Sequence, residues 1–169
     1  NNSIDVVLCH WALTLMNPIT PVLNEVRRVL SSGGRFAALV NGPMDAAPGY
    51  GDVHNLIYEY VQAKLPKYGE IDLGDPRIRS TDSLRDLLSE AFPDAKINIE
   101  TNVVSMEGPV AKVAETTAGF FYASFILPSE VREIMLSKLS SLLTISKQSR
   151  DLERQGRFSM PINRLVITK

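Results

Sequence analysis

The sequence predicts an α/β fold with helices flanking a sheet, and two observations carry this prediction. The first is an apolar run at residues 4–8, which holds one acid, Asp5, and is typical of a strand covered on both faces by helices. The second is the order of patterns over residues 4–40, which reads strand, amphipathic helix, strand. A crossover of this length makes the two strands parallel and their connection right-handed.

Two prolines, Pro18 and Pro21, mark the entry to the first predicted helix. Its apolar positions recur every three or four residues and form one buried face: Ile19, Val22, Leu23, Val26, Val29 and Leu30. Gly33 and Gly34 are expected to end this helix, because glycine accepts the left-handed conformation of a helix carboxyl cap. Residues 35–40, RFAALV, then form a second strand, and residues 41–52 form a loop rich in Gly and Pro at its carboxyl end.

The middle of the chain continues this alternation. Helical spacing of apolar residues predicts a helix over about 53–65. Ser80 is the expected N-cap of another helix, whose apolar stripe is Leu84, Leu87, Leu88 and Phe92. Residues 95–107 alternate apolar and polar side chains as a half-buried strand does, with Ile97 and Ile99 facing inward and Val103 or Val104 as a third inward position.

The last third of the chain contains a short helix and an aromatic segment over residues 109–125, and then a long helix. The long helix begins at Pro128, and its stripe is Val131, Ile134, Met135, Leu139, Leu142 and Leu143. A polar stretch at 147–157 leads into a terminal strand that carries Pro161 in its early part, where a missing N–H is tolerated. We expect residues 1–169 to form a single domain, which is an ordinary size for one core.

Composition narrows the classes of function. Lys and Arg (18) nearly balance Asp and Glu (19), so no net field favours nucleic acid or an anionic membrane as a partner. A single cysteine rules out an internal disulfide framework, and the two histidines, His10 and His54, are too few and too far apart for a zinc site. No apolar run reaches the roughly 18 residues of a membrane span. We therefore expect a cytoplasmic protein without a metal.

Several stretches, taken in order, carry a family resemblance. IDVVLCHWALTLMNP, VLNEVRRVLSSGG and RFAALV resemble the second half of a class I S-adenosylmethionine-dependent methyltransferase. STDSLRDLLSEAFPDAKINIE resembles that family's next helix and sixth strand, and GRFSMPINRLVITK resembles its closing strand. The resemblance implies a partial Rossmann-like methyltransferase sheet, with strands 4-5-7-6 of the family order and flanking helices.

The same resemblance implies that part of the cofactor site is missing. Family members carry a glycine-rich turn after their first strand, where the backbone approaches the cofactor, and an acid that binds the ribose hydroxyls. The pattern G-x-G occurs here only as Gly49 and Gly51, after the equivalent of the fifth strand. The sequence therefore resembles the carboxyl-terminal portion of a methyltransferase, truncated before the fourth strand. Alone, it should bind S-adenosylmethionine weakly or not at all.

A sheet that starts at the fourth strand has an unpaired edge at residues 4–9. An apolar edge of this kind invites pairing with another chain. We therefore expect a homo-oligomer formed through this edge, unless the chain is a proteolytic remnant.

The resemblance implies that Cys9, His10 and Trp11 bind the cofactor, because they occupy the turn that flanks its methionine and adenosine parts. Neighbours on a strand point to opposite faces, so Cys9 and His10 are not expected to form a nucleophile and base pair. Packing at the end of the strand is the alternative for Cys9. Trp11 has two interpretations. It can serve as a stacking platform, for adenine or for an aromatic substrate, or it can be a core residue.

Met44 and Tyr50 are the candidates for substrate binding, because they lie in the loop after the equivalent of the fifth strand. The aromatic segment 119–125 can line the same pocket. For Phe120 and Phe121, packing under the terminal helix is the alternative. No catalytic residue is predicted, since methyl transfer is largely a matter of alignment and desolvation.

The implied function is transfer of a methyl group from S-adenosylmethionine to a small-molecule acceptor, with this chain supplying the acceptor-side half of the enzyme. The alternative is a cofactor-free binding or interaction module on the same half-fold, which the missing glycine loop favours. An oxidoreductase is disfavoured, because no strand leads into a dinucleotide fingerprint.

Overall fold

The computed structural model describes residues 1–67, 74–145 and 154–169, and the chain divides into two compact units. The first unit consists of Asn1–Ala46, Asp72–Val103 and Pro161–Lys169, and the second of Ala47–Ile71 and Val104–Met160. The single domain expected over residues 1–169 stays a prediction.

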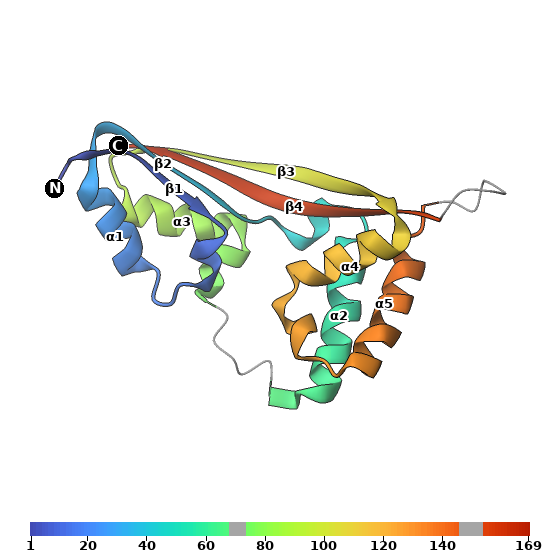
Figure 1. Cartoon of the computed structure of the whole chain (residues 1–169). Helices are drawn as coiled ribbons and strands as arrows, with labels where there is room; N and C mark the ends of the chain where they lie inside the picture. The colour runs from blue at the N-terminus through green and yellow to red at the C-terminus, as the bar shows by residue number, and fades with distance from the viewer. Residues whose placement is uncertain (68–73, 146–153) are drawn as a thin grey trace. The chain divides into compact units, whose positions relative to one another are not determined.

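Four strands of the described residues form one sheet in the order β1-β2-β4-β3 (Figure 1). Their bounds are Ile4–His10 for β1, Leu30–Asn41 for β2, Lys96–Pro109 for β3 and Gln155–Thr168 for β4. β1 runs parallel to β2, with Val7 opposite Phe36, and β4 runs antiparallel to β2. This is the partial sheet, 4-5-7-6 in the family order, that the sequence predicts.

The helices alternate with these strands along the chain. Their bounds are Thr20–Val29 for α1, Tyr50–Lys64 for α2, Thr81–Ala91 for α3, Val110–Phe120 for α4 and Ser129–Leu143 for α5. No helix among the described segments is long and apolar enough to span a membrane.

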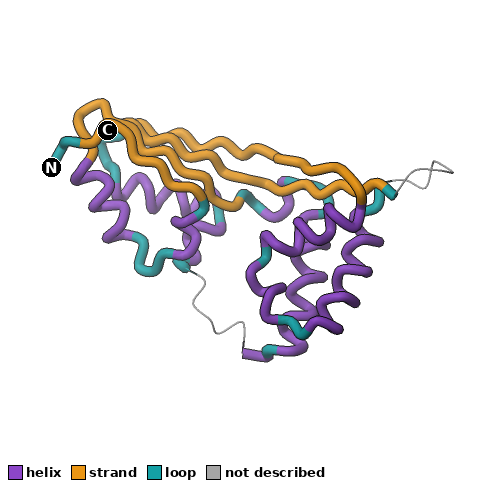
Figure 2. Tube along the Cα trace, viewed as in Figure 1, coloured by secondary structure: helices purple, strands orange, loops and turns teal. Residues whose placement is uncertain are grey.

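The core of the first unit lies between its strands and the helices α1 and α3, which are on the same side of the sheet (Figure 2). Its fully buried members include Leu23 of α1, Phe36 of β2 and Phe92 after α3. The predicted stripe Leu84, Leu87, Leu88 and Phe92 is confirmed as part of this core. Ser80 is confirmed as the N-cap of α3, because its Oγ accepts a hydrogen bond from the Ser83 N–H at 3.5 Å.

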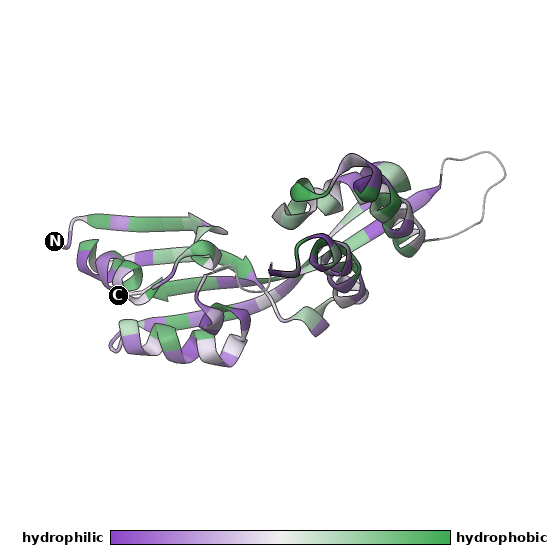
Figure 3. Cartoon of the chain, turned by 90° about the horizontal axis from the view of Figure 1, so that it is seen from below, coloured by the Kyte–Doolittle hydropathy of each residue, from purple (hydrophilic) through white to green (hydrophobic). Residues whose placement is uncertain are grey.

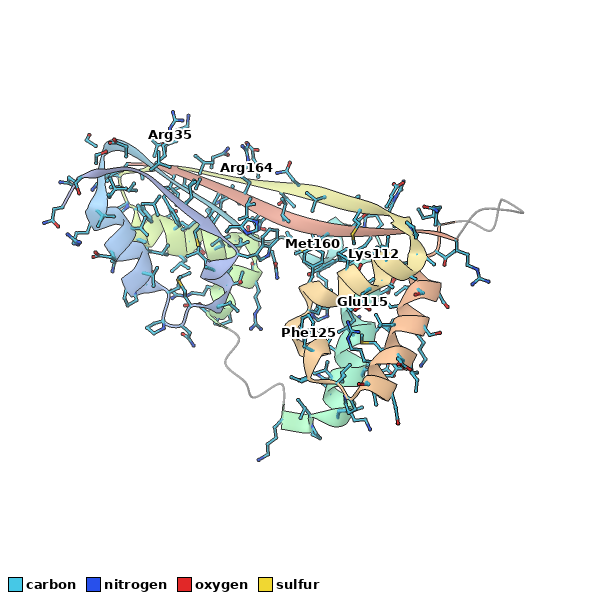
Figure 4. The ribbon with its side chains drawn as sticks, in the orientation of Figure 1. Arg35, Lys112, Glu115, Phe125, Met160 and Arg164 are labelled. Carbon is cyan, nitrogen blue, oxygen red and sulfur yellow. The ribbon has the colours of Figure 1, made fainter. Side chains whose placement is uncertain are left out.

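The expectation that β1 is covered on both faces is wrong. Val7 and Cys9 pack against the core of the first unit, but Leu8 is 76% exposed on the opposite face. The apolar run identified a strand correctly, whereas periodicity alone does not say which faces find a partner. Arg35 of β2 and Arg164 of β4 also project from the side of the sheet opposite α1 and α3 (Figure 4).

The predicted carboxyl cap of the first helix is also wrong. α1 ends at Val29, and Leu30 is extended and fully buried as the first residue of β2. Gly33 does have a left-handed φ of 77°, but it lies within β2, where its N–H donates to the Lys169 carbonyl at 2.8 Å. The glycines therefore lie in the irregular first part of β2. The helix ends before them, because Leu30 is already extended and buried in the core.

The second unit is built on α2, α4 and α5, with α5 in contact with both other helices. Its core includes Val53 and Ile57 of α2, Val113 of α4 and Met135 and Leu139 of α5. α2 begins at Tyr50, three residues before the predicted start, after Gly49 in the left-handed conformation.

Two positions of the predicted α5 stripe are exposed, and so are both alternatives for the third inward position of β3. Ile134 and Leu142 of α5 are among the large exposed apolar side chains, and so are Val103 and Val104 of β3. Most of the predicted polar stretch, residues 147–153, lies outside the described residues.

Candidate functional site

The turn after β1 holds Trp11 in an unusual and well-supported backbone conformation. Trp11 has a φ of 57°, in the left-handed region that residues other than glycine rarely adopt. Its N–H donates to the Leu39 carbonyl of β2 at 3.0 Å, and its carbonyl accepts from Thr14 Oγ1 at 2.6 Å. Such strain persists where the surroundings fix it, and it is frequent at functional sites.

The indole of Trp11 joins the carboxyl ends of β1 and β2. Its Nε1–H donates to Oδ1 of Asn41, the last residue of β2, at 2.6 Å. The His10 ring meets the indole edge to face, with ring centroids 4.8 Å apart. Two aromatic rings and an amide therefore lie together at the strand ends, where ligands bind in open α/β sheets.

Cys9 and His10 differ in their surroundings, as the alternation of a strand requires. Cys9 is half-buried against the core of the first unit, whereas His10 is exposed. The geometry agrees with the expectation that they form no nucleophile and base pair.

A second segment, at Gly74 and Asp75, packs against the short helix that follows the turn, and the sequence analysis did not identify it. Gly74 has a φ of 88°, and a Cβ at this position would lie 2.1 Å from the Thr14 carbonyl oxygen. The Asp75 N–H donates to the Met16 carbonyl at 3.1 Å. Gly74 and Asp75 therefore hold the short 3-10 helix η1, Ala12–Leu15, in place. The sequence did offer one local indication of a turn here, because Gly74 stands beside Asp75, an N-cap residue type, and Asp75 precedes Pro76.

The Asp75 carboxylate is itself anchored. It caps the short 3-10 helix Pro76–Arg79 by accepting from the Arg77 N–H at 3.0 Å, and it pairs with the Arg77 guanidinium at 2.7 Å. The hydrogen bond from the Arg77 side chain is the main reason that the pKa of Asp75 is lowered. Arg77 also donates to Thr20 Oγ1 of α1 at 3.2 Å, which links this support to the helix after the turn.

The predicted acceptor residues fall in different units. Met44 lies in the short 3-10 helix Met44–Ala46, three positions after Asn41 in the first unit, and is 45% exposed. Tyr50 starts α2 in the second unit and is buried, with its ring 6.3 Å from Phe121 and 6.1 Å from Phe158. Burial raises the pKa of the Tyr50 phenol, so this hydroxyl stays protonated.

The second unit also holds an aromatic cluster around His54, which sequence reasoning missed as a site. The His54 ring stacks on Tyr58 with centroids 4.3 Å apart and meets Phe121 edge to face at 6.1 Å. Burial lowers the pKa of His54, and its contact with Asn55 offsets only part of that effect. The imidazole is therefore neutral near pH 7. The i, i+4 spacing of His54 and Tyr58 on one helix was the available signal.

Within the described parts of the chain, no three His, Cys, Asp or Glu residues come together as a metal site would require.

Comparison with known proteins shows which fold this chain has. Residues 1–38 match the family model described as a methyltransferase domain, and this segment includes β1, the Trp11 turn and α1. No curated protein sequence matches the chain. A protein from Bacillus halodurans C-125 assigned as a methyltransferase has a similar structure, with a TM-score of 0.53 and 11% identity.

The chain has a methyltransferase fold. The alignment to the B. halodurans structure covers 99% of this chain and 65% of that one. The YcgJ protein of Bacillus subtilis superposes with a TM-score of 0.51 and 13% identity, covering 99% of this chain and 64% of its own. A protein from the antibiotic biosynthesis pathway of Anabaena variabilis, also assigned as a methyltransferase, superposes with a TM-score of 0.52 and 15% identity. That alignment covers 99% of this chain and 67% of the A. variabilis chain. The methyltransferase-fold chain thus spans about two thirds of these structures' length.

Proposed function

We propose that this chain forms part of an enzyme that transfers a methyl group from S-adenosylmethionine to a small-molecule acceptor. The observation that carries the proposal is the position of the family match, because residues 1–38 include the whole turn that the site geometry singles out. The three similar structures with TM-scores above 0.5 support the fold on which this chemistry is built.

The residues at the turn fit one side of the cofactor. The His10 and Trp11 rings offer aromatic surface on which an adenine can stack, and Asn41 holds the indole in place. A left-handed residue at the strand end lets the chain turn away from the ligand, while the N–H of Trp11 stays bonded to β2. Cys9 is half-buried and packs against the core beneath the turn. The glycine-rich segment of this sequence does not fit a cofactor loop, because Gly49 and Gly51 lie at the start of α2.

When bound, S-adenosylmethionine supplies a methyl group on a positively charged sulfur. The role of the protein is to align the acceptor and exclude water, which is worth several kcal/mol without any acid or base. We assign Met44 to the acceptor region because it follows Asn41 closely and its side chain is exposed. Tyr50 is proposed to shape the acceptor region from within the aromatic core of the second unit. The nearly balanced charge, −1 overall, favours a small molecule over nucleic acid.

A second candidate function is a cofactor-free binding or interaction module. The exposed apolar side chains on β1, of which Leu8 is the most exposed at 76%, favour it. The two candidates differ in whether the Trp11 turn responds to cofactor.

Trp11 is the only tryptophan in the sequence, which makes a direct test possible. Protein labelled with 5-fluorotryptophan gives one fluorine resonance, and S-adenosylhomocysteine is titrated against it. The proposal predicts a saturable shift with a weak dissociation constant, on the order of 1 mM. Adenine and homocysteine added separately should each give a smaller shift.

A matched control adds a second label away from the turn. The variant Phe125→Trp keeps Trp11 and places a second reporter at an exposed aromatic position of the second unit. The added resonance should not move with S-adenosylhomocysteine, while the Trp11 resonance shifts as in the wild type. A Trp11 resonance that does not respond at any soluble concentration would count against the proposed function and for the binding module.

A further inference from the structure

An open groove lies on the second unit between α2 and α5, two helices that contact each other (Figure 1). Its volume is about 520 Å³. Its walls come from both helices and are formed by Asp52, Asn55, Leu56 and Glu59 of α2 and by Lys138 and Leu142 of α5. None of these residues has a role in the proposed methyl transfer, so the groove requires a separate explanation.

The apolar part of the groove consists of one leucine from each helix. Leu142 is 44% exposed, and Leu56 is half-buried. Ile134, which is 55% exposed, lies about two helical turns before Leu142 on the same face of α5. The helices of the second unit carry both hydrophobic and hydrophilic residues (Figure 3). α5 thus has an exposed apolar stripe beside the one that Met135 and Leu139 bury in the core, and such a stripe indicates a surface that takes a partner.

The rim of the groove is acidic. Asp52 and Glu59 are exposed on α2, about two helical turns or about 10 Å apart along the helix. No side chain of the described residues forms an ion pair with either carboxylate. Lys138, the cation of the groove, is attracted by Glu59 at longer range, but its Nζ lies over the Tyr60 ring, 5.2 Å from the centroid. Two carboxylates are therefore left to a positively charged partner.

We propose that this groove binds an amphipathic helix of another protein, with apolar side chains on Leu56 and Leu142 and with lysine or arginine side chains on Asp52 and Glu59. A helix that binds in a groove contacts it through positions i, i+3, i+4 and i+7. Basic side chains two turns apart on the bound helix have the same spacing as the two carboxylates. A small molecule fits less well, because small-molecule sites bury most of the ligand and this groove is open to solvent.

A second copy of this chain is a poorer occupant. If α5 packed on its own copy about a two-fold axis through the groove, Lys138 would meet Lys138 of the partner subunit. Among the helices of the described residues, only α1 carries two arginines. Arg28 of α1 is paired with Glu25 of the same helix, and α1 has no large exposed apolar side chain. The charge of the groove therefore favours a helix of another protein.

Synthetic peptides test this binding with the full chain. The probe is a fluorescent peptide of about 14 residues, or four helical turns, with leucine on one face and lysine on the other. One control peptide has glutamate in place of lysine, and another has the composition of the probe in scrambled order. Anisotropy at low salt should give a dissociation constant on the order of 10–100 μM for the probe and at least about tenfold weaker binding for both controls. Equal binding of either control would overturn the proposal.

Variants of the groove test where the probe binds. The double variant Asp52→Asn and Glu59→Gln should weaken binding about fivefold or more, and Leu142→Lys about tenfold or more. These side chains are exposed, so the variants should stay folded by circular dichroism. The double variant Asp86→Asn and Glu90→Gln is the matched control, because it removes the same charge from exposed positions of α3 in the first unit. Absence of probe binding, or equal losses in groove and control variants, would overturn the proposal.

Light scattering after size exclusion tests the second copy as occupant. Without peptide, the wild-type chain and Leu142→Lys should have the same mass. A wild-type dimer that Leu142→Lys dissociates would assign the groove to a second copy and overturn the proposal. These measurements need no cofactor, so a negative result here leaves the proposed methyl transfer unaffected, and a silent Trp11 turn leaves the groove unaffected.

Discussion

Replacing Gly74 by alanine should destabilise the protein strongly, because this glycine packs closely against the backbone of η1, the short helix that follows Trp11. The added Cβ would lie 2.1 Å from the Thr14 carbonyl oxygen, a distance that Cβ atoms essentially never show, so η1 must move. The positive φ of 88° adds backbone strain. Left-handed backbone costs roughly 1–2 kcal/mol in a residue with a Cβ, and overpacking adds about 1–3 kcal/mol. We expect a total loss of about 2–5 kcal/mol in the free energy of unfolding.

Urea unfolding measures this loss, and the fluorescence of Trp11 reports on the turn itself. Gly33→Ala is the matched control, because Gly33 also has a left-handed φ, 77°, but a Cβ there meets no atom within 4 Å. The control should lose only the strain contribution, roughly 1–2 kcal/mol. Equal losses in the two variants would refute the close approach of Gly74 to Thr14 as the reason for the glycine. An unchanged Trp11 emission in folded Gly74→Ala would refute its role in supporting the turn.

Two further predictions concern Asp75, which holds the segment beside the Trp11 turn, and Phe92, in the core of the first unit. The pKa of Asp75 is lowered in the folded chain, chiefly by the hydrogen bond from Arg77, so its stabilising contribution is present above the unfolded pKa and is lost as pH falls through the folded pKa. Wild-type stability should therefore fall more steeply below about pH 4 than that of Asp75→Asn, and parallel curves of unfolding free energy against pH would contradict this. Phe92→Ala should cost about 3–5 kcal/mol, because the Phe92 side chain is 2% exposed and its ring stacks on Phe36 with centroids 6.4 Å apart. Thermal unfolding checks this second value, and a loss below about 1 kcal/mol would show that the pocket collapses around the alanine.

Much of the fold could be predicted from the sequence, because local patterns and their order agree with one another. Ser80 and the stripe of α3 are clear examples, since capping chemistry and helical spacing identify the same boundaries. The order of strands followed from the family resemblance, not from any single motif. Gly33 misled the prediction, because a glycine signal says that the backbone is left-handed without saying in which element it lies.

The candidate site was less predictable, since its geometry depends on contacts between distant residues. Trp11 was identified by its place after the first strand, but its bond to Asn41 joins residues 30 positions apart. Gly74 approaches Thr14 across an even longer gap in sequence, and the local pattern around Gly74 indicates a turn without indicating its partner. Tyr50 was predicted as an acceptor contact because it lies in a Gly-rich loop, yet its ring is buried among aromatic side chains of the second unit.

Calorimetry tests most directly whether the Trp11 turn belongs to a cofactor site. The wild-type protein and Trp11→Ala are each titrated with S-adenosylhomocysteine, after circular dichroism has shown that both are folded. We expect weak but saturable heat for the wild type and a loss of most of that heat in Trp11→Ala. Equal heats from the two proteins, or no binding heat from either, would contradict the assignment of this turn to the cofactor.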